Sequence, residues 1–167
     1  MTLRSCCLLC MLALPALAQV EGTWDLVQAP DLEAQVAAAT KGLRPAEADR
    51  ARRRLQVVRA APRRITLRHA GGRFHAEAEG EPALDVPDTG RAVPWTGPDG
   101  GTYLAAVRRE GKALVQTLMG EDGMRAWTYR LEGLVLRVRV ESKGLLLRRP
   151  LVYTLVYRRA PAEGGRR

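Results

Sequence analysis

From residue 64 onward, short runs of alternating apolar and polar residues follow one another, and most of them are separated by turns that contain glycine. This alternation is the period of a half-buried β-strand, because successive side chains point to opposite faces. It predicts strands at 64–69, 73–78, 83–86, 102–109, 112–119, 124–131, 134–140 and 151–158. Residues 88–101, with two prolines and four glycines, predict a long loop with one weak strand around Trp95. The chain is therefore expected to be mainly β and antiparallel.

Three turns allow one face of the sheet to be followed across four strands. A two-residue turn at 110–111 places Arg109 opposite Lys112, and a two-residue turn at 132–133 places Leu131 opposite Leu134. A four-residue turn at 120–123 places Met119 opposite Met124. The opposite face is mostly arginine and threonine, so the shared face is expected to point inward. It consists of Tyr103, Ala105, Val107, Leu114, Gln116, Leu118, Arg125, Trp127, Tyr129, Leu131, Leu134, Leu136, Val138 and Val140, and the last strand adds Leu151, Tyr153, Leu155 and Tyr157.

A helical segment interrupts the strands near the start. Residues 22–27 predict a first strand, and Asp31 is a good N-cap for a helix over 32–41 that Gly42 would end. Pro45 suits the first turn of a second helix over 45–60. A meander of eight to ten short antiparallel strands hides its edges by closing into a barrel or by folding as a sandwich. Helices inserted after the first strand are placed as a lid over one end of a barrel, spanning about residues 31–60.

Four short segments carry a resemblance to a known family. They are Gly-Thr-Trp-Asp-Leu at 22–26, Gly-Lys-Ala-Leu-Val-Gln at 111–116, Gly-Leu-Val-Leu at 133–136, and 153–157 in the last strand. With this order of strands and helices, the chain resembles the intracellular fatty-acid-binding proteins and, more broadly, the calycins, which include the lipocalins. The resemblance implies a closed up-and-down barrel of eight to ten antiparallel strands, capped by two helices and holding a hydrophobic ligand. It also implies that Trp24 packs at the closed end against a basic residue, Arg158 or Arg159.

The chain departs from the family where the family holds a carboxylate. The resemblance places an Arg-x-Tyr pair on the last strand, and the matching positions here are Leu155 and Tyr157. A second family arginine would be sought at Arg130, which the predicted register puts on the outer face. Arg125 is then the basic residue of the inner face, near the end of its strand. The tyrosine of the clamp is kept and its arginine is lost, so the resemblance does not extend to a carboxylate ligand.

The polar residues of the inner face have two interpretations. In the first, a hollow barrel uses them to orient a ligand against apolar walls. In the second, the barrel is filled and the tyrosines are satisfied core residues. Gln116 favours the first interpretation, because a buried amide needs partners that a ligand or a trapped water supplies. The candidate ligand-binding residues are Gln116, Arg125, Trp127, Tyr129, Leu136, Tyr153, Leu155 and Tyr157.

The first 18 residues have the composition of a secretory signal: Arg4 precedes a short apolar stretch and an Ala-x-Ala site ends at Ala18. All three cysteines, Cys6, Cys7 and Cys10, lie in this segment. The expected organisation is a signal peptide at 1–18, one barrel domain at 19–159 and a disordered tail at 160–167. The expected location is periplasmic or secreted, and the chain is interpreted as a bacterial exported relative of the family. Cleavage would leave 26 basic and 18 acidic residues.

The net positive charge, the arginines of the second helix and the two histidines lead to the remaining expectations. An exported basic protein is expected to meet anionic lipid or acidic partners rather than nucleic acid. The arginines of the second helix, including Arg50, Arg53 and Arg54, are either a solvated face or a contact with an anionic membrane. His69 and His75 lack metal-ligand neighbours, so no metal, cofactor or catalysis is expected, and the protein is expected to be a monomer. The alternative is an envelope interaction domain with a solid barrel, whose basic surface contacts anionic lipid, polysaccharide or protein. An enzyme using Arg125 or a tyrosine is a third hypothesis.

Overall fold

The computed structural model describes residues 20–56, 61–121, 123–144 and 147–161. The predicted signal peptide and most of the predicted tail lie outside these residues. The elements up to the fourth strand are β1 (Gly22–Gln28), α2 (Leu32–Thr40), α3 (Pro45–Gln56), β2 (Arg64–Ala70), β3 (Arg73–Ala78) and β4 (Leu84–Pro87). They are followed by β5 (Val93–Thr96), β6 (Thr102–Glu110), β7 (Ala113–Gly120), β8 (Gly123–Glu132), β9 (Val135–Gly144) and β10 (Leu151–Arg159).

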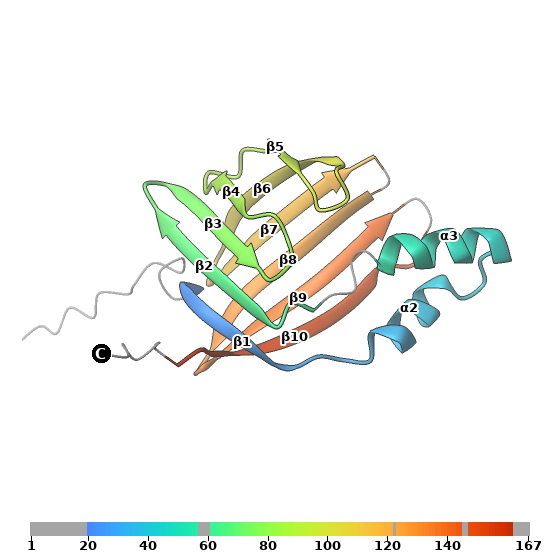
Figure 1. The fold of residues 1–167 in the computed structure, drawn as a ribbon, viewed down its shortest axis with the longest axis horizontal. Helices are drawn as coiled ribbons and strands as arrows, with labels where there is room; N and C mark the ends of the chain where they lie inside the picture. Colours follow the sequence, from blue (N-terminus) through green and yellow to red (C-terminus); the bar gives the residue numbers. More distant parts are fainter. Residues whose placement is uncertain (1–19, 57–60, 122, 145–146, 162–167) are drawn as a thin grey trace, which may run out of the picture.

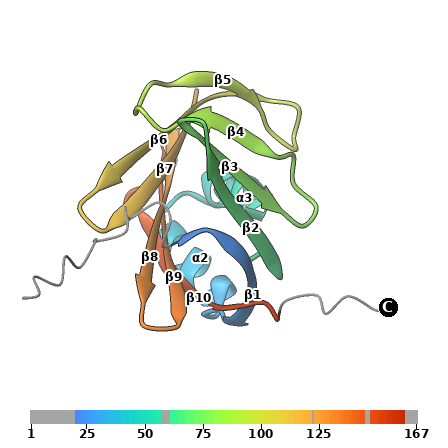
Figure 2. The ribbon, with the colours of Figure 1, turned by 90° about the vertical axis from the view of Figure 1, so that its left-hand side faces the viewer.

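The strands form one ten-stranded antiparallel sheet that curls into a near-closed up-and-down barrel (Figures 1 and 2). Their order is β4-β3-β2-β1-β10-β9-β8-β7-β6-β5, so every strand except β1 and β10 pairs only with its neighbours in the sequence. The short strands β4 and β5 are the two ends of the sheet, and no ladder joins them in the described part of the chain. The predicted fold class is confirmed. We call the gap between β4 and β5 the seam.

Both helices lie at one end of the barrel (Figure 1), as the predicted lid requires. The Asp31 carboxylate accepts hydrogen bonds from the backbone N–H groups of Glu33 and Ala34, which caps α2 where the sequence predicts. Ala51 and Leu55 are buried on α3. Arg50 is exposed, whereas the side chains of Arg53 and Arg54 and the last predicted residues of this helix, 57–60, lie outside the described part. None of the described helices is long and apolar enough to cross a bilayer.

The predicted register is confirmed between β7 and β8, where Met119 lies opposite Met124 and Gln116 opposite Trp127. It is wrong by two residues in the neighbouring hairpins, where Glu110 pairs with Ala113 and Glu132 with Val135. The turns therefore begin with Gly111 and Gly133, which have φ angles of 59° and 61°. A type I′ turn that began one residue earlier would force a glutamate into the left-handed region.

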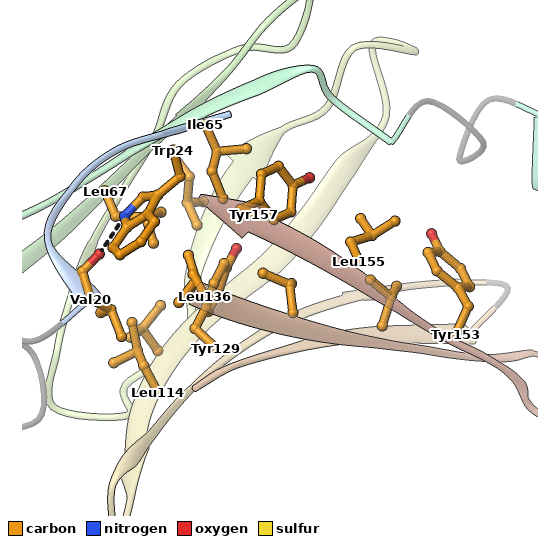
Figure 3. Packing of buried hydrophobic residues seen from close by; sticks show 14 of the residues in the cluster. Val20, Trp24, Ile65, Leu67, Leu114, Tyr129, Leu136, Tyr153, Leu155 and Tyr157 are labelled. Carbon is orange, nitrogen blue, oxygen red and sulfur yellow. Dashed lines mark hydrogen bonds between the residues drawn. The ribbon is translucent and has the colours of Figure 1, made fainter. Parts of the chain in front are cut away.

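A shift of two residues leaves every side chain on its predicted face. One residue is nevertheless misplaced, because Leu134 lies in the β8–β9 turn and its side chain is 88% exposed. The rest of the predicted inner face is buried or half-buried, and Ala105, Val107, Leu136 and Val140 are fully buried. On β10 the four predicted inward residues are also buried. Figure 3 shows three of them, Tyr153, Leu155 and Tyr157. The barrel interior is therefore the hydrophobic core of the molecule.

Candidate functional site

Two adjoining cavities in the described part of the molecule differ tenfold in volume. The wide cavity, of about 690 Å³, lies at the end covered by α3, and the inner cavity, of about 70 Å³, lies in the barrel. The wide cavity is lined by Ala51, Leu55, Glu81, Trp95, Pro98, Asp99, Gly101, Thr102, Tyr103, Leu118, Gly120, Glu121, Gly123, Met124, Arg125, Trp127, Ser142, Lys143, Gly144 and Leu147. Glu81, Trp95, Leu118, Arg125 and Trp127 line both cavities, and we call these five residues the throat.

Arg125 is the basic residue of the throat, where β8 begins. Its guanidinium lies 5.2 Å from the centroid of the Trp127 ring, and its Nε donates a hydrogen bond of 3.3 Å to Ser142 Oγ on β9. No carboxylate of the described residues forms an ion pair with it. Removal from water lowers the pKa of Arg125, although arginine stays charged at neutral pH. The throat thus holds a half-buried cation that an anion could neutralise or that could donate hydrogen bonds to a polar group.

The carboxylates near Arg125 belong to loops. Glu81 lies in the β3–β4 connection, and partial removal from water raises the pKa of its carboxyl group, whereas the charge of Arg125 opposes this rise. Asp99 lies in the β5–β6 loop and accepts a 2.6 Å hydrogen bond from the Tyr103 hydroxyl. This bond, together with the backbone N–H of Gly101, lowers the pKa of Asp99. The wide cavity therefore combines apolar and aromatic side chains with several charged and polar ones.

Gln116 and Tyr129 meet at the inner cavity. The Tyr129 hydroxyl donates a buried hydrogen bond of 2.9 Å to Gln116 Oε1, and burial raises the pKa of Tyr129. The Gln116 side-chain nitrogen makes no hydrogen bond within the described residues, although the side chain is only 7% exposed. A buried N–H group without a partner costs free energy. The inner cavity that Gln116 lines is large enough to hold the water that would accept from it.

The remaining predicted residues divide between cavity wall and core. Tyr153, Leu155 and Tyr157 line the inner cavity, and the Tyr157 hydroxyl donates to the Pro62 carbonyl oxygen at 3.2 Å. Burial raises the pKa of both Tyr153 and Tyr157. Leu136 is fully buried and lines neither cavity. Seven of the eight candidate residues thus border a cavity, as their position on one face predicts.

Comparison with solved structures places this geometry among known barrels. The chain is similar to the REP1-NXSQ fatty acid transporter, with 15% identity, a TM-score of 0.59, and coverage of 87% of this chain and 99% of that one. It is similar to Echinococcus granulosus fatty-acid-binding protein 1, with 12% identity, a TM-score of 0.59, and coverage of 86% and 99%. The values for human cRBP IV are 20%, 0.54, and 84% and 98%. Neither a family model nor a curated protein sequence matches the chain.

The fold is that of the fatty-acid-binding proteins. Within this fold, the sequence predicted the β10 and β8 walls but missed the residues that loops and short elements bring to the throat, Glu81 and Trp95. Trp95 projects from β5, contacts the Tyr103 ring at a centroid distance of 6.0 Å, and donates from Nε1 to the Ala83 carbonyl oxygen at 3.1 Å. This hydrogen bond crosses the seam. A tryptophan between two prolines in a predicted loop was the only signal for it in the sequence.

The end of the fatty-acid-binding-protein fold opposite the helices is closed by Trp24 and a basic residue. The Trp24 ring is buried, and its Nε1 donates to the Val20 carbonyl oxygen at 2.9 Å (Figure 3). Of the two arginines proposed to pack on it, Arg159 does so, with its guanidinium 4.6 Å from the ring centroid. The assignment of this role to Arg158 is wrong. Arg159 lies directly opposite Trp24 in the β1–β10 ladder, whereas Arg158 lies opposite Asp25 and points outward.

The two histidines lie in carboxylate pairs rather than in a metal site. His69 Nε2 is 2.7 Å from Asp88 Oδ2, and His75 Nε2 is 2.8 Å from Glu77 Oε1. The described residues contain no cluster of three histidine, cysteine, aspartate or glutamate side chains that could hold a metal ion. The wide cavity offers apolar and aromatic surface to a nonpolar group, and the throat offers Arg125 to a polar one.

Proposed function

We propose that the protein binds a small hydrophobic ligand, lipid-like or fatty-acid-like, and carries out no covalent chemistry on it. One observation carries this proposal: the wide cavity of about 690 Å³ presents a continuous set of apolar and aromatic side chains, beside which charged and polar side chains also line it. The apolar and aromatic side chains are those of Ala51, Leu55, Trp95, Leu118, Met124, Trp127 and Leu147. The cavity volume lies in the range of about 300–1,000 Å³ that small-molecule sites occupy. The fold supports the proposal, since the REP1-NXSQ protein and the Echinococcus protein are named for fatty acids.

The two cavity volumes determine where the ligand lies in this proposal. The inner cavity, at about 70 Å³, holds water rather than a ligand unless its side chains move. The tyrosines around it already have core positions, and two of them donate hydrogen bonds to protein oxygens. The barrel is thus filled deep inside and hollow at the helix-covered end. The ligand is proposed to occupy the hollow end, beneath Ala51 and Leu55 of α3.

The throat determines how the ligand is oriented. Arg125 has the charge, the desolvation and the lack of a carboxylate partner that favour contact with the polar end of a ligand. Trp127 and Leu118 present apolar surface beside it. The polar end is therefore placed at the boundary between the two cavities and the nonpolar body in the wide cavity.

Native mass spectrometry of the purified protein, followed by organic extraction, tests the proposal. A bound apolar molecule near one-to-one stoichiometry is the expected result, and extracted protein should take up a fluorescent fatty-acid probe. Trp127→Ala should weaken probe binding about tenfold, because the variant removes a large apolar wall and exposes Arg125 to water.

Leu131→Ala is the matched control, since Leu131 lies on the same strand and inner face but lines neither cavity. It should lower stability and leave probe affinity unchanged. An apo mass combined with no probe uptake would remove the ligand from the proposal. Equal loss of affinity in both variants would show that binding does not depend on the wide cavity.

We also propose, on the sequence alone, that the protein acts outside the cytoplasm after cleavage near Ala18. The mass of the mature protein isolated from its host tests this proposal. A chain that begins at Gln19 supports it, and an uncleaved chain recovered from the cytoplasm contradicts it.

A further inference from the structure

A row of apolar side chains crosses the outer surface of the barrel next to the wide cavity. The sheet register places Pro94 opposite Leu104, Leu104 opposite Met119, and Met119 opposite Met124, so four neighbouring strands contribute to one row. Leu104 is 47% exposed and Met119 is 52% exposed, which makes them two of the large exposed hydrophobic residues of the described chain. We call Pro94, Leu104, Met119 and Met124 the outer apolar row.

The next row of outward-facing side chains on β6, β7 and β8 is also uncharged. The register aligns Ala106 with Thr117 and Thr117 with Ala126, again across β6, β7 and β8. In a chain where 27% of the residues are charged, the outer face of a sheet is expected to carry arginine and glutamate side chains, as this sheet does farther from the helices. A contiguous exposed apolar surface marks an interaction site more often than scattered exposed residues do.

The basic residues at this end of the barrel fit an anionic surface. Lys143 continues the row on β9, opposite Met124. The exposed arginines Arg148 and Arg149 lie in the β9–β10 connection, at the end of the barrel where the row lies. Glu121, in the β7–β8 turn, is an exposed acidic neighbour, and Glu141 is paired with Lys143. Over the whole chain 27 basic residues face 18 acidic ones.

We propose that the outer apolar row is the surface by which this protein docks on an anionic lipid bilayer. Leu104 and Met119 would enter the boundary between headgroups and acyl chains while Lys143 and the arginines of the β9–β10 connection contact lipid phosphates. Unbranched methionines suit such a surface, because they adapt their shape to an irregular partner. Docking through this row does not depend on the proposed function. It would account for the position of the row beside the wide cavity. Met124 belongs to the row and also lines the wide cavity, so docking would hold the cavity rim against the membrane.

Co-sedimentation with vesicles tests this proposal. The purified, ligand-extracted protein is mixed with phosphatidylcholine vesicles that contain or lack phosphatidylglycerol. Binding is expected to the anionic vesicles and to weaken with added salt. The double variant Leu104→Gln/Met119→Gln should reduce the partition coefficient about tenfold, because two exposed apolar side chains lose their transfer into lipid. Since Met119 is about half exposed, the single Met119→Gln variant keeps the test available should the double variant fold poorly, with a several-fold loss.

Leu134→Gln is the control, because Leu134 is 88% exposed in the β8–β9 turn, at the other end of the barrel. It should bind vesicles as the parent protein does. The proposal is overturned if the parent ignores anionic vesicles, or if Leu134→Gln loses as much binding as the double variant. It is also overturned if Arg50→Gln/Arg52→Gln on α3 abolishes binding while the row variants retain it. Sedimentation equilibrium that shows a dimer dissociated by Met119→Gln would assign the row to a second copy instead.

Discussion

At the scale of single residues, Gly22, Trp24 and Arg159 form a structural unit. A Cβ atom added to Gly22 would lie 2.5 Å from Nη1 of Arg159, and Gly22 has a φ angle of 125°. The glycine thus leaves the space through which the arginine reaches the tryptophan ring. The sequence indicated the three residue types but not which arginine is used. Continuing the alternation two residues past Tyr157 would have selected Arg159, since both lie on the inward side of β10.

Replacing this arginine tests the unit. Arg159→Ala should lower the free energy of unfolding by about 1 kcal/mol, from the lost cation–π contact and the lost packing of the side-chain stem. Arg158→Ala, one residue away and exposed, should change the free energy of unfolding by less than about 0.5 kcal/mol. Urea unfolding followed by circular dichroism measures both. Equal effects of the two variants would contradict the assignment.

At the scale of elements, the face of each strand was predictable and its exact partner was not. Alternation fixes which side chains share a face, and a shift of two residues does not alter it. The pairing depends on which residue of a turn takes a positive φ angle. In both misassigned hairpins the glycine begins the turn, at Gly111 and Gly133. Because the β7–β8 ladder was predicted correctly, Arg125, Trp127 and Gln116 were still placed together.

The turn at Gly133 gives a sharp comparison. In the sequence-based register Leu134 would be a core residue, whereas it is 88% exposed in the structure. Leu134→Asn should therefore change stability by less than about 0.5 kcal/mol. Leu136 lies two residues later and is fully buried. Leu136→Ala should lower the free energy of unfolding by about 2–4 kcal/mol, because it removes buried apolar atoms and leaves a cavity. A large loss of stability on substitution of Leu134, measured by thermal or urea unfolding, would support the sequence-based register instead.

Short elements explain what the sequence did not predict in the site. β5 has four residues and lies in a segment rich in proline and glycine, so its pattern is too brief to show alternation. The position of Trp95 at the throat depends on its contacts with Ala83 and Tyr103, which lie 12 and 8 residues away. Glu81 depends likewise on a connection between strands. Local patterns predict the walls of a barrel better than the loops at its mouth.

At the scale of the whole molecule, the surface carboxylates determine how stability responds to acid. Hydrogen bonds from arginine, lysine, histidine and tyrosine side chains lower the pKa of several carboxyl groups below the ordinary values of 3.8 for aspartate and 4.5 for glutamate. These groups are Asp25, Glu47, Glu77, Asp99 and Glu141. The folded protein therefore holds fewer protons on these groups than the unfolded chain does in this range. Their contribution is present above the ordinary values and is lost as the pH falls through the lowered ones.

The melting temperature should accordingly fall when the pH is lowered from 7 to about 3. Protonation also increases a net charge that is already +9, and the resulting repulsion acts in the same direction. Glu81, whose pKa is raised, acts in the opposite direction as a single group. Thermal unfolding at a series of pH values measures the net effect, and Asp25→Asn should make the pH dependence shallower. A melting temperature that is constant or rises toward acid would contradict this account.

The seam has a consequence for the order of the chain itself. The sheet begins with β4 and ends with β5, and the residues between them, 88–92, are the covalent link across the gap. The first and last strands are hydrogen-bonded neighbours, with Trp24 opposite Arg159. In a circular permutant that joins the original termini and opens the chain at 88–92, the strands would therefore follow one another in the sequence in the same order as in the sheet. Every ladder would then join consecutive strands, and the lower contact order should make this permutant fold faster than the natural chain.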